Sequence, residues 1–132
     1  MSMTEWLRMT GVCGIACALV AACACGSTSS PSMEEGRSLY GTNGCASCHG
    51  PAGHGDGPVA KTLVPAPRDF RDAAAFKNGT EVPAIARTLA EGLATNGAGM
   101  PRFDHLTDHE RRSIALFIRS LHEDVKEGTG QP

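Results

Sequence analysis

The residues with the clearest chemical potential lie in the stretch GCASCHG, residues 44–50. Cys45 and Cys48 stand three positions apart, and His49 follows directly. Two thiols and an imidazole at this spacing are compatible with four kinds of site: a zinc ligand pair, a redox dithiol, a disulfide bond or a covalently held haem. The rest of the chain has to separate these alternatives.

Three of the four alternatives find little support elsewhere in the sequence. Structural zinc sites commonly use two pairs of Cys or His ligands, and no second Cys pair follows Cys48. A thioredoxin-like dithiol belongs in a βαβ context, and no convincing strand is visible. A disulfide leaves His49 unexplained. Haem accounts for all three residues, because both thiols can form thioethers with vinyl groups while the imidazole binds the iron. The sequence therefore predicts one covalently bound haem c.

Around this motif the chain resembles the small class I c-type cytochromes, the single-haem electron carriers of bacteria. The resemblance covers residues 33–123. It implies an all-α cytochrome c fold, with three to four helices wrapped around one haem. In this family a helix leads into the motif, a loop wraps the haem, and a late methionine binds the other face of the iron. A centre with both axial positions filled passes electrons and does little bond chemistry, so we expect a carrier and not an enzyme.

The resemblance implies that Met100 is the second axial ligand, opposite His49. Met100 lies in GAGMPRF, which matches the Gly/Met/Pro loop of the family. A thioether favours ferrous iron, so a His/Met pair raises the reduction potential relative to two histidines. The alternatives are a filler role for Met100 and ligation by His105. The other histidines are expected away from the iron: His54 in a solvated loop, and His109 and His122 at surface or interface positions of the last helix.

The Gly- and Pro-rich segment after the motif predicts a loop that wraps the haem edge. A ligating histidine normally donates its other N–H to an acceptor. In the family this acceptor is often a proline carbonyl in a Gly-Pro pair, which matches Pro58 best, with Pro65 and Pro67 as rivals. Haem propionates bind arginine or backbone N–H groups. Arg68 is the candidate partner, and its alternative role is that of a surface arginine.

Two helices are expected before the methionine loop. Ser32 and Glu35 form a capping-box pattern ahead of a helix over residues 33–42, in which Gly36 allows close packing. A middle helix is expected over residues 82–93, with a proline in its first turn, where proline is tolerated.

The last helix follows a second capping-box pattern, Thr107 and Glu110. Its apolar residues recur at i, i+3, i+4 and i+7, which is typical of an amphipathic helix. In the family the first and last helices cross. The candidates for this contact are Leu39, Tyr40, Ile114, Phe117 and Ile118.

The N-terminus reads as an export signal. The uncharged apolar run VCGIACALVAACAC is shorter than the roughly 20 residues that span a bilayer, and it ends in small residues. Its end, LVAAC, resembles a bacterial lipobox, which implies cleavage before a lipidated Cys23; an ordinary cut after Ala24 is the rival. The expected organisation is a signal peptide at 1–22, a flexible linker at 23–32, a cytochrome c domain at 33–123 and a disordered tail at 124–132.

Length and composition agree with a small exported domain. The chain has 132 residues and a formal net charge of −2, which fits one domain and no nucleic-acid partner. Aromatic residues make up 5%, so a large apolar ligand would help to fill the core. We expect a periplasmic or membrane-tethered monomer that passes single electrons between protein partners. The alternatives are a gas sensor or haem enzyme with a labile sixth ligand, and a fixed electron-transfer subunit of a larger complex.

Overall fold

The computed structural model describes residues 29–93 and 99–128, and from residue 123 onward it describes the backbone only. The expected signal peptide, Cys23 and most of the expected linker lie outside the described residues. None of the helices in the described part is long and apolar enough to cross a membrane.

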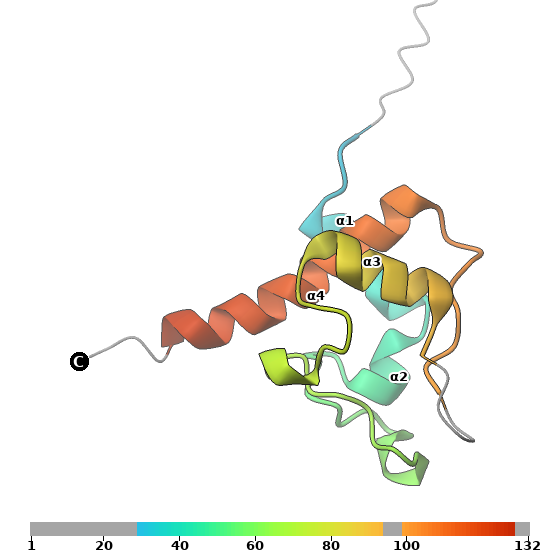
Figure 1. Cartoon of the computed structure of the whole chain (residues 1–132), viewed down its shortest axis with the longest axis vertical. Helices are drawn as coiled ribbons and strands as arrows, with labels where there is room; N and C mark the ends of the chain where they lie inside the picture. Colours follow the sequence, from blue (N-terminus) through green and yellow to red (C-terminus); the bar gives the residue numbers. More distant parts are fainter. Residues whose placement is uncertain (1–28, 94–98, 129–132) are drawn as a thin grey trace, which may run out of the picture.

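Within this part the architecture is helical. The elements in chain order are α1 (Met33–Thr42), α2 (Cys45–His49), the 3₁₀ turns η1 (Ala60–Thr62) and η2 (Ala73–Ala75), α3 (Val82–Glu91) and α4 (Asp108–Gly128) (Figure 1). The described residues contain no strand, only an isolated antiparallel bridge between Leu93 and Met100. The all-α prediction is therefore confirmed.

Helix α1 begins at the predicted cap, but the capping box is only half formed. Ser32 Oγ accepts from the backbone N–H of Glu35 at 3.2 Å, as the pattern predicts. The carboxylate of Glu35 instead accepts from Ser113 Oγ at 2.6 Å and lies 2.8 Å from His109 Nε2. The Ser32 N–H donates to the same Ser113 Oγ at 3.2 Å. The second half of the box is thus replaced by contacts with α4.

The crossing of α1 and α4 is the most extensive contact between helices in the described part of the chain. A Cβ added to Gly36 would lie 1.8 Å from the carbonyl oxygen of Ser113, so only glycine fits here. Tyr40 and Phe117 pack edge to face with ring centroids 5.1 Å apart. All five predicted contact residues lie in or against the buried core: Leu39, Tyr40, Ile114, Phe117 and Ile118.

Helix α4 has the complete capping box predicted for it. The Thr107 N–H donates to Glu110 Oε2 at 2.7 Å, and the Glu110 N–H donates to Thr107 Oγ1 at 3.2 Å. The helix continues to Gly128, into the segment expected to be a tail. His122, expected at a surface or interface position, is buried at 7% exposure.

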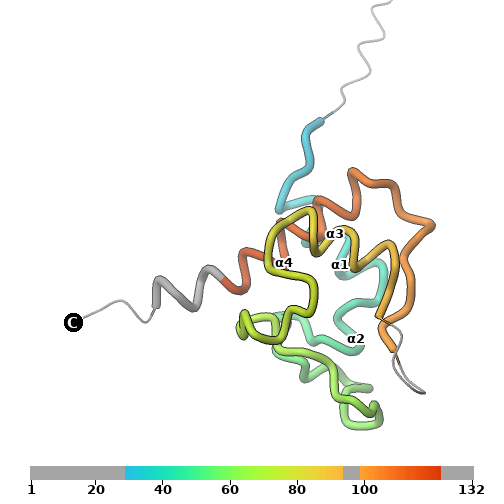
Figure 2. Tube along the Cα trace, in the orientation of Figure 1, coloured from blue at the N-terminus to red at the C-terminus, as the bar shows by residue number. Residues whose placement is uncertain are grey.

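Helix α3 ends at Glu91, slightly earlier than predicted, because Gly92 takes a φ of 71°, a conformation that glycine adopts at little cost. Its buried face consists of Ile85, Ala86 and Leu89. The chain between α2 and α3 runs out past α2 and then returns toward α3 (Figure 2). Together, α1, α3, α4 and this loop surround the residues of the motif.

Candidate cofactor site

The short helix α2 presents Cys45, Cys48 and His49 within little more than one turn. Glycines with positive φ flank it, Gly44 at 74° and Gly50 at 76°. These two residues let the chain turn sharply into and out of the helix. The local sequence therefore fixes the motif as one helical turn between two bends.

The following loop folds back over the end of α2 and satisfies carbonyls that a helix end leaves open. Three backbone N–H groups donate to them: Gly55 to His49 at 2.9 Å, Gly57 to Cys48 at 3.1 Å and Val59 to Ser47 at 3.1 Å. A Cβ at Gly57 would lie 2.3 Å from the Ser47 oxygen, so the glycine is needed for this approach. The glycine-rich sequence thus folds against the motif.

The motif lines a cavity of about 320 Å³. Its walls come from α1, α2, the α2–α3 loop, α3, the methionine loop and α4, and they are largely apolar. The bulkier apolar lining residues are Tyr40, Leu63, Phe70, Phe76, Ile85, Leu89, Phe103 and Ile118. The described lining includes two cationic side chains, Arg68 and Lys77, and no carboxylate.

The tautomer of His49 follows from its hydrogen bond. Its Nδ1 lies 3.2 Å from the backbone oxygen of Arg68, and a carbonyl oxygen only accepts, so Nδ1 carries the proton. Nε2 then keeps its lone pair. Phe70 stacks on the imidazole with centroids 4.4 Å apart and planes 20° apart. Both contacts hold the ring in one orientation.

The acceptor for His49 is therefore Arg68 and not Pro58, which the sequence favoured. Pro58 is exposed and does not line the cavity. The chain at this point is still tied to α2 through Val59, and it reaches the imidazole only at Arg68. The rivals Pro65 and Pro67 line the cavity, but neither supplies the acceptor.

Burial sets the protonation of the motif. It lowers the pKa of His49, and the hydrogen bond to Arg68 opposes this only in part, so the imidazole is neutral at neutral pH. Burial also raises the pKa of Cys45 to about 11. Both Cys45 and Cys48 are free thiols.

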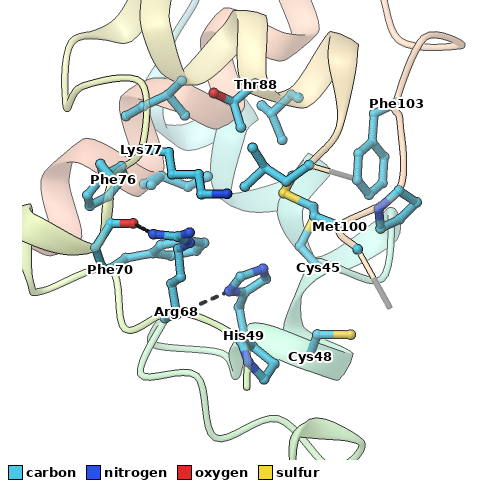
Figure 3. Close-up of a pocket in the computed structure, with 18 of the residues that line it drawn as sticks. Cys45, Cys48, His49, Arg68, Phe70, Phe76, Lys77, Thr88, Met100 and Phe103 are labelled. Atoms are coloured by element: carbon cyan, nitrogen blue, oxygen red, sulfur yellow. Dashed lines mark hydrogen bonds between the residues drawn. The ribbon is translucent and has the colours of Figure 1, made fainter. Parts of the chain in front are cut away.

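Met100 faces the same cavity from the loop after α3. Its carbonyl accepts from the Leu93 N–H at 3.0 Å, and a Cβ on Gly92 would lie 2.8 Å from that oxygen. The turn at the end of α3 therefore holds the methionine backbone closely. Figure 3 shows the Met100 side chain and the His49 imidazole directed into one space. Gly97, in the same GAGMPRF stretch, lies outside the described residues.

The other histidines named from the sequence do not line this cavity. His105, the rival ligand, is exposed, and its Nε2 lies 3.2 Å from Asn43 Oδ1. His54 is exposed too, 4.0 Å from Asp56, as expected of a solvated loop histidine.

The cations lie on the side of the cavity away from the cysteines (Figure 3). The Arg68 guanidinium donates to the carbonyl of Ala75, and Lys77 lines the cavity beside it. Arg68 was predicted from the sequence as a residue of the site, whereas Lys77 and Phe70 were not. A phenylalanine in a loop otherwise rich in Gly and Pro was the available signal for Phe70, since such a side chain needs burial. Lys77 carries no such signal.

Comparison with known proteins identifies the class. The family model "Cytochrome c" matches residues 33–122, well over half of the chain, and this chain belongs to that family. The comparison with curated proteins gave no match. Among solved structures, a chain of the reducing HAO-like protein complex of Kuenenia stuttgartiensis is similar, with a TM-score of 0.60 and 31% identity. The match covers 75% of this chain and 46% of that one, so this chain spans less than half of its length.

Membership in the family identifies covalently bound haem c as the cofactor. The residues present fit this cofactor: two free thiols, a neutral imidazole with a free Nε2, a thioether and an apolar wall. The zinc alternative lacks a ligand set, since the described residues contain no group of three His, Cys, Asp or Glu side chains that could hold a metal.

Proposed function

We propose that this chain is an exported class I cytochrome c with one haem, which carries single electrons between protein partners. The observation that carries the proposal is the pairing of two neutral ligands across one apolar cavity. His49 Nε2 is free because Nδ1 donates to Arg68, and Met100 enters from the α3–α4 loop. When bound, the haem supplies a reversible one-electron ferric–ferrous couple.

The side chains of the cavity have distinct roles in this proposal. Cys45 and Cys48 would hold the cofactor covalently, and His49 and Met100 would supply the two protein ligands of its iron. The apolar walls would exclude water from the cofactor, and this would limit solvent reorganisation during electron transfer. The propionates fit the end with Arg68 and Lys77, because both side chains donate to carboxylates.

The same geometry favours a carrier over a gas sensor or haem enzyme. With a thioether and an imidazole both bound to the iron, no coordination position would be left for a small ligand. The histidines that could act in acid–base chemistry, His54 and His105, do not line the cavity.

Carbon monoxide binding to the reduced holoprotein tests the carrier proposal. We expect no change in the visible spectrum under carbon monoxide, and rapid binding in Met100→Ala, which serves as the positive control. Ready binding to the wild-type protein would move the sensor or enzyme alternative to the front.

A fixed subunit of a larger complex is the second candidate. It is favoured by the similarity to one chain of a protein complex, and the match covers 46% of that chain. Native extraction in mild detergent separates the two proposals: a shuttle runs as a small single species, whereas a subunit co-migrates with its complex.

Location outside the cytoplasm, with a lipid on Cys23, is also part of the proposal. Its support is the LVAAC motif behind an uncharged apolar run. Replacing Cys23→Ala should move the mature haem protein from the membrane fraction to the soluble fraction. An unchanged membrane fraction would contradict the lipid anchor.

A further inference from the structure

His122 is a buried titratable side chain of α4 for which electron transfer alone gives no role. It is 7% exposed, and its Nδ1 lies 3.2 Å from the backbone oxygen of Arg71. Because a carbonyl oxygen only accepts, Nδ1 carries the proton and donates. His122 thus links α4 to the loop that contacts the His49 imidazole.

That loop segment, residues 68–76, is called the strap below, and it makes both contacts that orient His49. The Arg68 carbonyl accepts from His49 Nδ1 at 3.2 Å, and Phe70 stacks on the ring at 4.4 Å. The strap is closed on itself, because the Arg68 guanidinium donates to the carbonyl of Ala75. A shift of the strap would therefore move both contacts together.

A row of rings also joins His122 to His49 through the strap. Phe70 and Phe76 lie 5.9 Å apart between centroids, and Phe76 and His122 lie 6.3 Å apart. Figure 3 shows Phe70 and Phe76 side by side at the edge of the cavity. His122 of α4 therefore contacts the strap in two ways, through the hydrogen bond to the Arg71 carbonyl and through its ring beside Phe76.

We propose that His122 is a positioning residue that sets the orientation and basicity of the His49 imidazole through the strap. The inference rests on the proposed function, in which His49 binds the haem iron. A hydrogen bond to the second nitrogen of a ligating imidazole fixes the ring and raises its basicity. A more basic imidazole stabilises ferric iron, so loosening the strap raises the reduction potential.

Three variants separate the hydrogen bond from the bulk of the side chain. In His122→Asn the amide nitrogen takes the place of Nδ1, so the bond to the Arg71 carbonyl is kept. In His122→Gln the nitrogen takes the place of Nε2, and in His122→Leu the donor is gone. The holoprotein is measured in each case by redox titration and by the solvent exchange of the His49 Nδ1 proton in NMR of the reduced form.

We expect a raised potential and faster Nδ1 exchange in the Leu and Gln variants, and wild-type values in the Asn variant. The matched control is His109→Leu, which removes another hydrogen-bonded histidine of α4, one that pairs with Glu35. This control should lose stability but keep the wild-type potential.

Wild-type potential and exchange in the Leu and Gln variants would overturn the inference, as would an Asn variant that behaves like Leu. An equal shift in His109→Leu would also overturn it. If His122→Leu does not mature, the comparison of Asn with Gln decides, because both are polar and similar in size. Failure of the proposed function looks different: the wild-type protein itself would then lack a low-spin spectrum.

Discussion

The backbone carbonyl of Arg68 decides which nitrogen of His49 can bind a metal. It fixes the proton on Nδ1 and leaves Nε2 free without any change in protonation, since burial already lowers the pKa of His49. The stacked Phe70 ring adds a second restraint. The chemistry of the site thus depends on a backbone atom and an aromatic ring as much as on the motif.

Each cysteine of the motif should hold the cofactor through its own thioether. In Cys45→Ser or Cys48→Ser we expect haem that stays bound through one link, with its pyridine haemochrome band moved to longer wavelength, because one vinyl group stays conjugated. The exposed residue between them provides the control, and Ser47→Ala should keep the wild-type band. Haem that resists acid–acetone extraction from the double cysteine variant would contradict this assignment.

The sequence predicts side chains at this site better than it predicts backbone contacts. The motif predicted Cys45, Cys48 and His49 as site residues, and the Gly/Met/Pro pattern predicted Met100. All four line the cavity. The Arg68 carbonyl was missed because a carbonyl has no signature in the sequence and its position depends on the path of the whole loop. The burial of His122 was missed for the same reason, since it depends on where that loop crosses α4.

At the scale of elements, the crossing of α1 and α4 forms part of the cavity wall. Tyr40 belongs to this contact and also lines the cavity, and its hydroxyl donates to the carbonyl of Gly50 at 2.8 Å. The helix crossing therefore positions the end of α2 directly.

Gly36→Ala should destabilise this crossing. The added Cβ would lie 1.8 Å from the Ser113 oxygen, and overpacking of this kind costs about 3 kcal/mol. The matched control in the same helix is Gly41→Ala, whose added Cβ meets nothing within 4 Å and which should be neutral or stabilising by about 0.5 kcal/mol. Chemical denaturation measures both. Equal stability of the two variants would contradict the close packing.

Glu35 should make the crossing sensitive to acid. The hydrogen bond from Ser113 holds its pKa below the ordinary value of 4.5, and the contact with His109 acts in the same direction. A lowered pKa in the folded state stabilises the fold above about pH 4.5, and this contribution is lost as the pH falls through the folded pKa. The free energy of unfolding should therefore fall less steeply with acid in Glu35→Gln than in the wild type. Glu34→Gln, at the exposed neighbour, should keep the wild-type slope; a wild-type slope in Glu35→Gln would argue against the network.

The helix starts were predictable because capping residues act locally, and both capping patterns stand at true helix starts. The hydrogen-bond partners of the capping residues were less predictable. The Glu35 carboxylate accepts from Ser113 of the distant helix α4 and not from the cap of its own helix. The end of α3 was placed too late, since the turn at Gly92 reflects its contact with the Met100 backbone. Local sequence signals thus determine where these helices begin, whereas tertiary contacts determine the hydrogen-bond partners of the capping residues and the end of α3.

At the scale of the whole molecule, a chain with 5% aromatic residues folds around a cavity. In the described part of the chain, four helices and two loops contribute to its walls, so a cofactor held there would complete the core instead of lying on its surface. The all-α class was implied by the family resemblance that the motif carries, and the composition indicated a large apolar ligand. The path of the α2–α3 loop did not, because most of its contacts are backbone hydrogen bonds.

The central claim is that Met100 and His49 together bind the haem iron, and the near-infrared spectrum of the ferric holoprotein tests it most directly. We predict a weak sulfur-to-iron band in a low-spin wild-type protein, its loss in Met100→Ala, and its retention in His105→Ala, the control for the rival ligand. A band that survives in Met100→Ala, or a wild-type protein that is high-spin and lacks the band, would contradict the account.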